Sequence, residues 1–187
     1  MRKLVYYIAV SLDGYIAGPG GEYDFYPGDD AYAAWMGQRF PETIPTHIRA
    51  MLGVQDAPNK TFDTVLMGRG TYEIDTAVTN PYAHLKQYVV SSTLEQADPA
   101  ITLVRSDPIG LVRELKQQDG LDIYLCGGGK LAGELLPEID QLIIKSYPVI
   151  AGAGIPMIDG DFQPTGFTPA ERESFDCGVF VTWYSRK

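Results

Sequence analysis

Short β-rich runs alternate with segments of helical spacing along the whole chain, and this alternation most constrains the fold. It is typical of a sheet covered by helices on both faces, not of a sandwich or a bundle. Strands are predicted at 4–10, 64–67, 88–91, 101–104, 123–126, 142–150, 167–175 and 179–184. Helices are predicted around Tyr32, Trp35 and Met36, around Ile44, Ile48, Met51 and Leu52, and around Val112 and Leu115. The last two strands flank Asp176-Cys177-Gly178, a short glycine-containing loop that predicts a hairpin.

The length and composition fit a single domain over 1–187. The chain is 45% hydrophobic and has no internal repeat or polar linker. Its two cysteines, Cys126 and Cys177, lie far apart and match no metal-ligand spacing. We therefore expect no metal site and a reducing compartment.

The charge pattern excludes several partners. The net charge is -9 and no run of lysine or arginine occurs, which argues against binding a nucleic-acid backbone. The apolar run 4–10 is short and lacks a cleavage site, and no stretch approaches the roughly 20 apolar residues of a membrane span. We expect a soluble, cytoplasmic protein with neither a nucleic-acid nor a membrane partner.

A glycine-rich turn joins one predicted strand to the helix after it. Cys126 is followed by Gly127-Gly128-Gly129-Lys130, and the helix has Leu131, Leu135 and Leu136 on its apolar face. Free N–H groups and the helix dipole make such a turn an anion site. It is not a P-loop, because Leu131 stands where Ser or Thr should hold magnesium. The alternative is a tight strand-to-helix turn without a ligand.

Two further strand ends carry groups that suit a phosphate ligand. Gly68, Arg69 and Thr71 combine a planar cation and a hydroxyl with accessible backbone, and Ser91 and Ser92 end the next strand. An arginine on a solvated turn is the alternative for Arg69. Ligands of open α/β sheets bind outside the carboxyl ends of the strands, so we expect these groups to act together. The connection 17–30 is rich in glycine but carries Tyr23, Phe25 and Tyr26, which predicts a lid.

Four segments, 8–17, 65–71, 90–92 and 127–137, resemble in order and spacing the landmarks of dihydrofolate reductases. Segments 11–17 and 147–157 are closer to the reductase domain of the riboflavin-biosynthesis deaminase-reductase and its stand-alone relatives. The resemblance implies a three-layer α/β/α fold with a central mixed, mostly parallel sheet and a C-terminal antiparallel hairpin. The zinc signature of the deaminase is missing, so the chain would supply only the reduction step.

The resemblance also implies an activity. The chain would be an NADPH-dependent reductase that transfers hydride to a small pyrimidine- or pterin-like substrate, with 5-amino-6-(5-phosphoribosylamino)uracil of riboflavin synthesis as one candidate. The alternatives are a dihydrofolate reductase and a non-catalytic nucleotide- or pterin-binding protein. Relatives of the riboflavin branch pair into dimers, so a homodimer is expected.

The family motifs assign cofactor roles to residues of this chain. Arg69 and Thr71 would take the 2'-phosphate, beside Gly68, and Ser91 and Ser92 would lie by the adenine ribose. The segment 127–130 would hold the pyrophosphate with Leu131 next to it, and a cis peptide bond would join Gly127 to Gly128. Ala9 and Ile16 would flank the nicotinamide.

The proton donor is assigned by a weaker match. Pro27-Gly28-Asp29 resembles the context of the acidic residue that follows the lid in the family, so Asp29 is the candidate catalytic acid. Glu22, Asp24 and Asp30 are rivals, and Asp29 or Asp30 is also the natural N-cap of the next helix. His47 and His84 are expected to be exposed or structural. Lys145 is expected to point outward from a strand edge, the alternative being that it faces a ligand.

Overall fold

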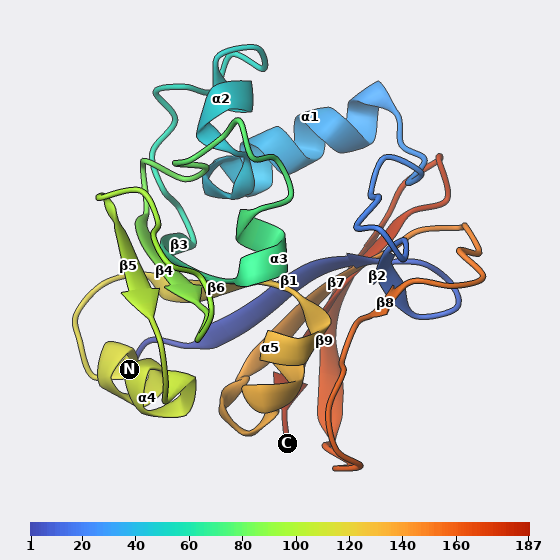
Figure 1. The fold of residues 1–187 in the computed structure, drawn as a ribbon. Coiled ribbons are helices and arrows are strands. Elements are labelled where there is room, and N and C mark those ends of the chain that lie inside the picture. The colour runs from blue at the N-terminus through green and yellow to red at the C-terminus, as the bar shows by residue number, and fades with distance from the viewer.

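The computed structural model describes residues 1–187, and its main element is an eight-stranded sheet (Figure 1). The strand order is β5-β4-β3-β6-β1-β7-β10-β9. The strands are β1 (Leu4–Val10), β3 (Phe62–Gly68), β4 (Lys86–Val90), β5 (Ile101–Val104), β6 (Asp122–Gly127), β7 (Gln141–Ser146), β9 (Phe167–Ser174) and β10 (Phe180–Arg186). The first six strands in this order, from β5 through β4, β3, β6 and β1 to β7, are parallel. Strand β10 is antiparallel to its neighbours β7 and β9. The predicted mixed sheet and the C-terminal hairpin are confirmed.

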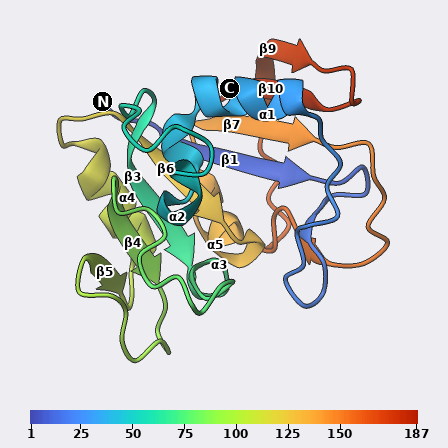
Figure 2. The same ribbon diagram turned by 90° about the horizontal axis from the view of Figure 1, so that it is seen from above.

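Helices cover both faces of the sheet and complete the predicted three layers. Helices α1 (Asp30–Arg39) and α2 (Thr46–Arg49) lie on one face with the 3₁₀ turn η1 (Pro41–Thr43). Helices α4 (Pro108–Lys116) and α5 (Gly129–Glu134) lie on the other, with η2 (Leu136–Glu138). The short helix α3 (Arg69–Tyr72) directly follows β3. Seen from above, α1 lies over the side of the sheet that carries β7 and β10 (Figure 2).

The alternation of side chains along the central strands divides the core in two. In β1, Val5 and Tyr7 belong to a core cluster of 18 residues beneath α1, whereas Leu4 and Tyr6 belong to a cluster of 12 beneath α4 and α5. Successive residues of a strand point to opposite faces, so a strand covered on both sides must be apolar throughout. This is why 4–10 reads as a continuous apolar run.

Two sequence predictions about the elements are wrong, and one small sheet was missed. The segment from Ile44 to Leu52 does not form one amphipathic helix, because α2 has only four residues and Met51 and Leu52 are 83% and 57% exposed. Strand β7 ends at Ser146 instead of continuing to residue 150, shortly before Pro148, which has no N–H to donate. A small second sheet, β2 (Tyr15–Ala17) with β8 (Ile155–Pro156), was not predicted. No helix has the length and apolar character to cross a membrane.

Candidate functional site

The three motif-bearing strands, β3, β4 and β6, end beside β1 along one side of the sheet, the side formed by the carboxyl ends of the parallel strands. We call this side the edge at which the site lies. Strands β4, β3, β6 and β1 are consecutive neighbours and all parallel, so their carboxyl ends meet. The register pairs Gly68 with Val90 and Met67 with Gly127. The structure thus brings the strand-end segments that were predicted separately to one place, as expected for a ligand site of an open α/β sheet.

Three predicted cofactor residues, Ile16, Gly68 and Thr71, lie around the first two glycines of the turn. The bond between Gly127 and Gly128 is cis, as the resemblance implied. A Cβ added to Gly128 would lie 3.7 Å from Thr71 Oγ1 and 4.0 Å from Ile16 Cδ1. A Cβ added to Gly68 would lie 3.5 Å from the Gly128 amide nitrogen. The two glycines are therefore flanked by a hydroxyl and an aliphatic side chain, next to backbone that has no side chain of its own.

Arg69 opens α3 at this edge and has partners within the chain. Its Nε donates to Glu73 Oε2 at 2.7 Å, and its Nη1 donates to Thr93 Oγ1 at 3.0 Å. The hydrogen bond and the charge of Glu73 raise the pKa of the guanidinium. The Arg69 side chain is 47% exposed, so the pair is solvated and weak, and a phosphate can compete with the carboxylate for it.

The two serines after β4 differ in their surroundings. Ser91 is buried, and its Oγ accepts the amides of Thr93 and Leu94 at 3.2 and 2.9 Å. Its hydroxyl hydrogen is still free to be donated. Ser92 is exposed. Ser91 thus shapes the turn that carries Thr93, the partner of Arg69.

The start of α5 supplies free backbone amides. The first helical hydrogen bond runs from the Ala132 amide to the Gly128 carbonyl at 3.0 Å, so the amides before Ala132 have no partner inside the helix. Leu131 is buried in the core and Lys130 is exposed. Gly129 is required for packing, because a Cβ there would lie only 2.1 Å from the Pro156 carbonyl oxygen.

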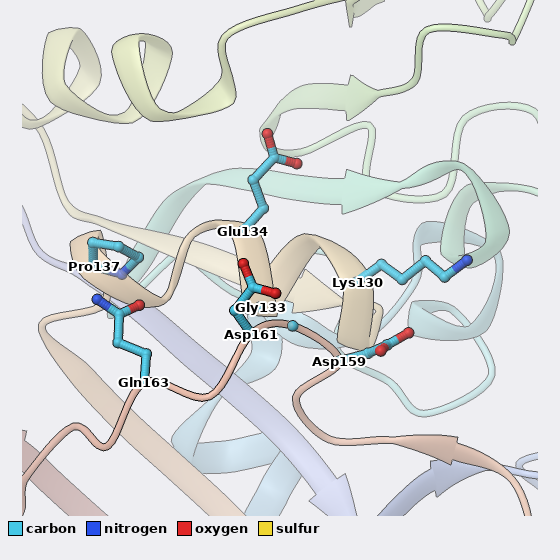
Figure 3. A pocket seen from close by; sticks show the side chains of 8 residues that line it. Lys130, Gly133, Glu134, Pro137, Asp159, Asp161 and Gln163 are labelled. Atoms are coloured by element: carbon cyan, nitrogen blue, oxygen red, sulfur yellow. The ribbon is translucent and has the colours of Figure 1, made fainter.

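A polar pocket lies behind α5 and does not resemble a site for a phosphate or for an apolar ring. It measures about 340 Å³ and lies between α5 and the loop after β8 (Figure 3). Its lining residues are Lys130, Gly133, Glu134, Pro137, Asp159, Gly160, Asp161 and Gln163. Three carboxylates and one lysine line the pocket, so its net charge is negative and disfavours anions. Its His, Cys, Asp and Glu residues form no group that could hold a metal ion.

The candidate acid Asp29 caps α1. Its Oδ1 accepts the Tyr32 amide at 2.8 Å, as an N-cap residue does, and the residue is exposed. The rivals Glu22, Asp24 and Asp30 are exposed too, and Glu22 bonds to the Gly20 amide. The capping role is confirmed, while the catalytic role of Asp29 stays a prediction.

Aromatic side chains anchor the predicted lid. Tyr26 donates a hydrogen bond to the Tyr15 carbonyl at 2.9 Å, and its ring centroid lies 4.5 Å from that of Tyr147. Tyr32 of α1 and Tyr147 share a hydrogen bond of 2.7 Å between their hydroxyls. The aromatic content of 17–30 is thus explained by packing at the carboxyl ends of β1 and β7, although Tyr23 is exposed.

Lys145 does not point outward from an edge, and the favoured prediction for it is wrong. Strand β7 is an inner strand, and the Lys145 ammonium lies 4.1 Å from the centre of the Tyr7 ring, on the α1 side of the sheet. Burial lowers the pKa of Lys145 to about 8, and the neighbouring Cys126 opposes this shift. Burial raises the pKa of Cys126. Its hydrogen bonds with Tyr124 and Tyr82 and the charge of Lys145 partly offset this rise.

Asp13 holds two loops together at the end of β1. Its carboxylate accepts the Ser11 hydroxyl at 2.6 Å and the amides of Ala151 and Gly152 at 3.0 and 2.7 Å. These hydrogen bonds, that from Ser11 first, lower the pKa of Asp13 to about 2. Asp13 therefore fixes the turn before Ile16 against the segment that follows Ile150. The sequence analysis did not single it out, because the two amides that it binds are about 138 residues away.

The two histidines behave as predicted. His47 is exposed, and His84 is partly buried between the Thr46 hydroxyl and the Glu42 carbonyl. Burial lowers the pKa of His84. Both residues therefore have surface or structural surroundings, and His84 lies before the amino end of β4.

Comparison with solved structures identifies the fold. The fold matches a "Putative riboflavin biosynthesis protein" from Shewanella sp. PV-4 (TM-score 0.72, 22% identity, 100% of this chain and 99% of that chain). It also matches the diaminohydroxyphosphoribosylaminopyrimidine deaminase/5-amino-6-(5-phosphoribosylamino)uracil reductase of Thermotoga maritima (0.66, 18%, 100% and 57%). A third match is the dihydrofolate reductase of Enterococcus faecalis complexed with NADP(H) and RAB-propyl (0.67, 14%, 99% and 96%). The chain has a reductase-like fold.

The family follows from the sequence. The model of the RibD C-terminal domain matches residues 2–181, so the chain belongs to the RibD C-terminal domain family. "Uncharacterized protein YwjB" of Bacillus subtilis (strain 168) is 32% identical over 166 residues, which cover 83% of this chain and 82% of that protein. The resemblance stated from the motifs is confirmed.

Proposed function

We propose that the protein is an NADPH-dependent reductase that transfers hydride to a small pyrimidine- or pterin-like substrate. The observation that carries the proposal is the meeting of Gly68, Thr71, Ile16 and the Gly127–Gly128 turn at one edge of the parallel sheet. Gly68 ends β3, Thr71 lies in the helix α3 that follows it, Ile16 lies in β2, and Gly127 ends β6. A shared ligand accounts for the arrangement.

The residues at this edge fit a phosphorylated dinucleotide. Gly127 has a φ of +124°, and a Cβ on Gly127 or Gly128 would lie 3.7 Å from the Thr71 hydroxyl, so glycines keep backbone accessible there. In this proposal the amides at the start of α5 bind the pyrophosphate, with Lys130 and Leu131 in that first turn. Arg69 and Thr71 bind the 2'-phosphate next to Gly68, and Ser91 and Ser92 lie by the adenine ribose.

The reacting end of the cofactor belongs at β1 in this proposal. Ala9 is partly exposed near the end of β1, and Ile16 lies in β2 beside Gly128. Both are apolar, so they exclude water from a nicotinamide ring placed between them. The cofactor supplies hydride, and the chain binds it, orients it and keeps its ring dry.

The substrate class is supported by the relatives. The Thermotoga neighbour is named for the reduction of 5-amino-6-(5-phosphoribosylamino)uracil, and the Enterococcus neighbour is a dihydrofolate reductase. Membership of the RibD C-terminal domain family favours the pyrimidine over folate, and the phosphoribosylaminouracil is the first candidate.

A non-catalytic nucleotide- or pterin-binding protein is the second candidate. One observation favours it: Glu22, Asp24, Asp29 and Asp30 are all exposed, so no predicted donor lies in a dry environment that would favour its protonated form. Turnover separates the two functions. We expect NADPH to be oxidised in the presence of the phosphoribosylaminouracil and not with dihydrofolate. Binding of NADPH without oxidation across a panel of pyrimidines and pterins would support the binding protein instead.

We also propose a two-fold homodimer. Strand β9 is the edge of the sheet, every residue after Phe167 in it is exposed, and Phe180 on the neighbouring β10 is 44% exposed. An uncovered edge strand is a site for pairing with another copy. Sedimentation equilibrium at micromolar concentration should give twice the chain mass of 20.6 kDa, and a mass of one chain would refute the dimer.

A further inference from the structure

Lys145 lies in a small group of residues on the α1 side of the sheet that we call the Lys145 cluster: Tyr7, Ala9, Cys126 and Lys145. The register pairs Lys145 with Ala9 of β1 and with Val181 of β10. Cys126 directly precedes the Gly127–Gly128 turn, and its pKa responds to the charge of Lys145. Ala9, Cys126 and Lys145 are all partly exposed.

The ammonium of Lys145 has no anionic partner. None of the chain's ion pairs includes Lys145, and the interaction found for its Nζ is with the face of the Tyr7 ring. A lysine in a strand interior is normally paired or directed into water. The chain keeps an unpaired charge in partly apolar surroundings instead, at the cost in proton affinity described above. A residue held in this way favours a role in binding.

The position of Lys145 relative to the proposed cofactor site indicates which molecule it would bind. Ala9, its register partner, is the residue proposed to flank the nicotinamide, while the phosphate-binding groups lie on β3, β4 and α5. Lys145 is therefore on the side where the hydride acceptor must be. Tyr7 and Tyr147 are buried, and neither carries a charge.

We propose that Lys145 is a substrate-binding residue of this reductase, and that its ammonium binds a carbonyl or carboxylate oxygen on the ring that accepts hydride. The inference rests on the proposed function and narrows its substrate class. An ammonium has three donors and no acceptor, so it selects rings that present oxygen and repels rings that carry positive charge. Oxo-pyrimidines fit this requirement, and protonated diaminopyrimidines do not.

The test measures binding without turnover. Isothermal titration calorimetry at neutral pH compares orotate, a pyrimidinedione with a carboxylate, with 2,4-diaminopyrimidine, using protein with and without NADP⁺. The unmodified protein should bind orotate more tightly than the diaminopyrimidine. Lys145→Met should weaken orotate binding by ~10-fold or more, because a charge-assisted hydrogen bond is lost, while Lys145→Arg should keep most of the affinity.

A matched control separates the local contact from net charge. Lys86 is exposed at the start of β4, and Lys86→Met removes the same charge far from the cluster, so orotate binding should not change. Melting temperature monitors folding, and Lys145→Met should not lower it, because an apolar stem replaces a desolvated charge.

The pH dependence gives a second readout. Orotate affinity of the unmodified protein should fall as pH rises through about 8, where Lys145 loses its proton, and this fall should vanish in Lys145→Arg. Burial raises the pKa values of the facing groups, Tyr7 of β1, Cys126 of β6, Tyr32 of α1 and Tyr147, so these stay neutral over that range.

Three results would overturn the proposal: orotate binding by Lys145→Met equal to that of the unmodified protein, an equal loss in Lys86→Met, or no orotate binding by the folded, unmodified protein. The NADPH thermal shift is recorded on the same samples. If the NADPH shift persists and Lys145→Met binds orotate as tightly as the unmodified protein, only the proposed role of Lys145 is refuted. If the unmodified protein shows no NADPH shift, the proposed function fails, and the cofactor-free titrations still decide the role of Lys145.

Discussion

The hydroxyl of Tyr32 lies 2.7 Å from that of Tyr147 and joins α1 to the segment that follows β7. Both side chains are buried, and burial raises both pKa values, so the pair stays neutral. One end of this link is close in sequence to Asp29, and the other is close to Lys145. The hydrogen bond therefore fixes the helix that carries the candidate acid relative to the strand that carries the candidate substrate-binding lysine.

Removing one hydroxyl of the pair should cost stability. Tyr32→Phe leaves the buried Tyr147 hydroxyl without a partner, which should lower the free energy of unfolding by about 1–2 kcal/mol. Urea denaturation measures the loss. The double variant Tyr32→Phe/Tyr147→Phe should lose less than the sum of the single variants, because the second substitution removes the orphaned group. Strict additivity would show that the two hydroxyls do not stabilise each other.

The strand pattern could be predicted from the sequence because it depends on local composition. The bounds of β1 and β5 agree with the prediction, since each is an apolar run with clear ends. The spacing of Ile44, Ile48 and Met51 predicted a helix that does not form. Helical spacing of apolar residues indicates a helix only where that face is buried, and Met51 is 83% exposed. The β2–β8 pair was missed because its short strands are about 140 residues apart and neither has a pattern of its own.

The residues of the candidate site also differ in whether a local sequence signal identifies them. Glycine turns and strand-end hydroxyls are local signals, and they identified the residues that meet at the sheet edge. The cation over Tyr7 and the loop clamp of Asp13 depend on which strands are neighbours, which a sequence without pairing information does not reveal. The usable signal for Lys145 was a single charge within an apolar strand.

The catalytic and capping roles of Asp29 can be separated by one substitution. If Asp29 is the general acid, Asp29→Asn should lower turnover by ~100-fold or more with little change in NADPH affinity, because Asn cannot donate the proton. Asn is also a good N-cap, so the melting temperature should hold. Asp30→Asn, at a rival carboxylate, shows which of the two neighbouring residues is needed for turnover. Unchanged turnover and melting temperature in Asp29→Asn would leave Asp29 as a cap alone.

The Asp13 clamp predicts a local acid transition. The folded pKa of about 2 lies below the ordinary value of 3.8, so the clamp stabilises the folded chain above about pH 4, and this contribution is lost as pH falls toward 2. The Gly152 amide, which donates to Asp13, should report the transition by NMR with a midpoint near 2. Ser11→Ala removes the strongest hydrogen bond and should move the midpoint up. A midpoint near 3.8 in the unmodified protein would contradict the clamp.

The most direct test of the central claim is the thermal shift with NADPH and with NADH. A ligand present at 100 times its dissociation constant stabilises the folded state by about 2.7 kcal/mol, which for a chain of this size raises the melting temperature by roughly 5–10 °C. We predict such a shift with NADPH and a smaller one with NADH, since the guanidinium of Arg69 meets only the 2'-phosphate. Arg69→Ala should erase the difference, and Glu73→Gln, which removes the competing carboxylate, should widen it. Equal shifts for the two nucleotides in the unmodified protein, or no shift with either, would contradict the account.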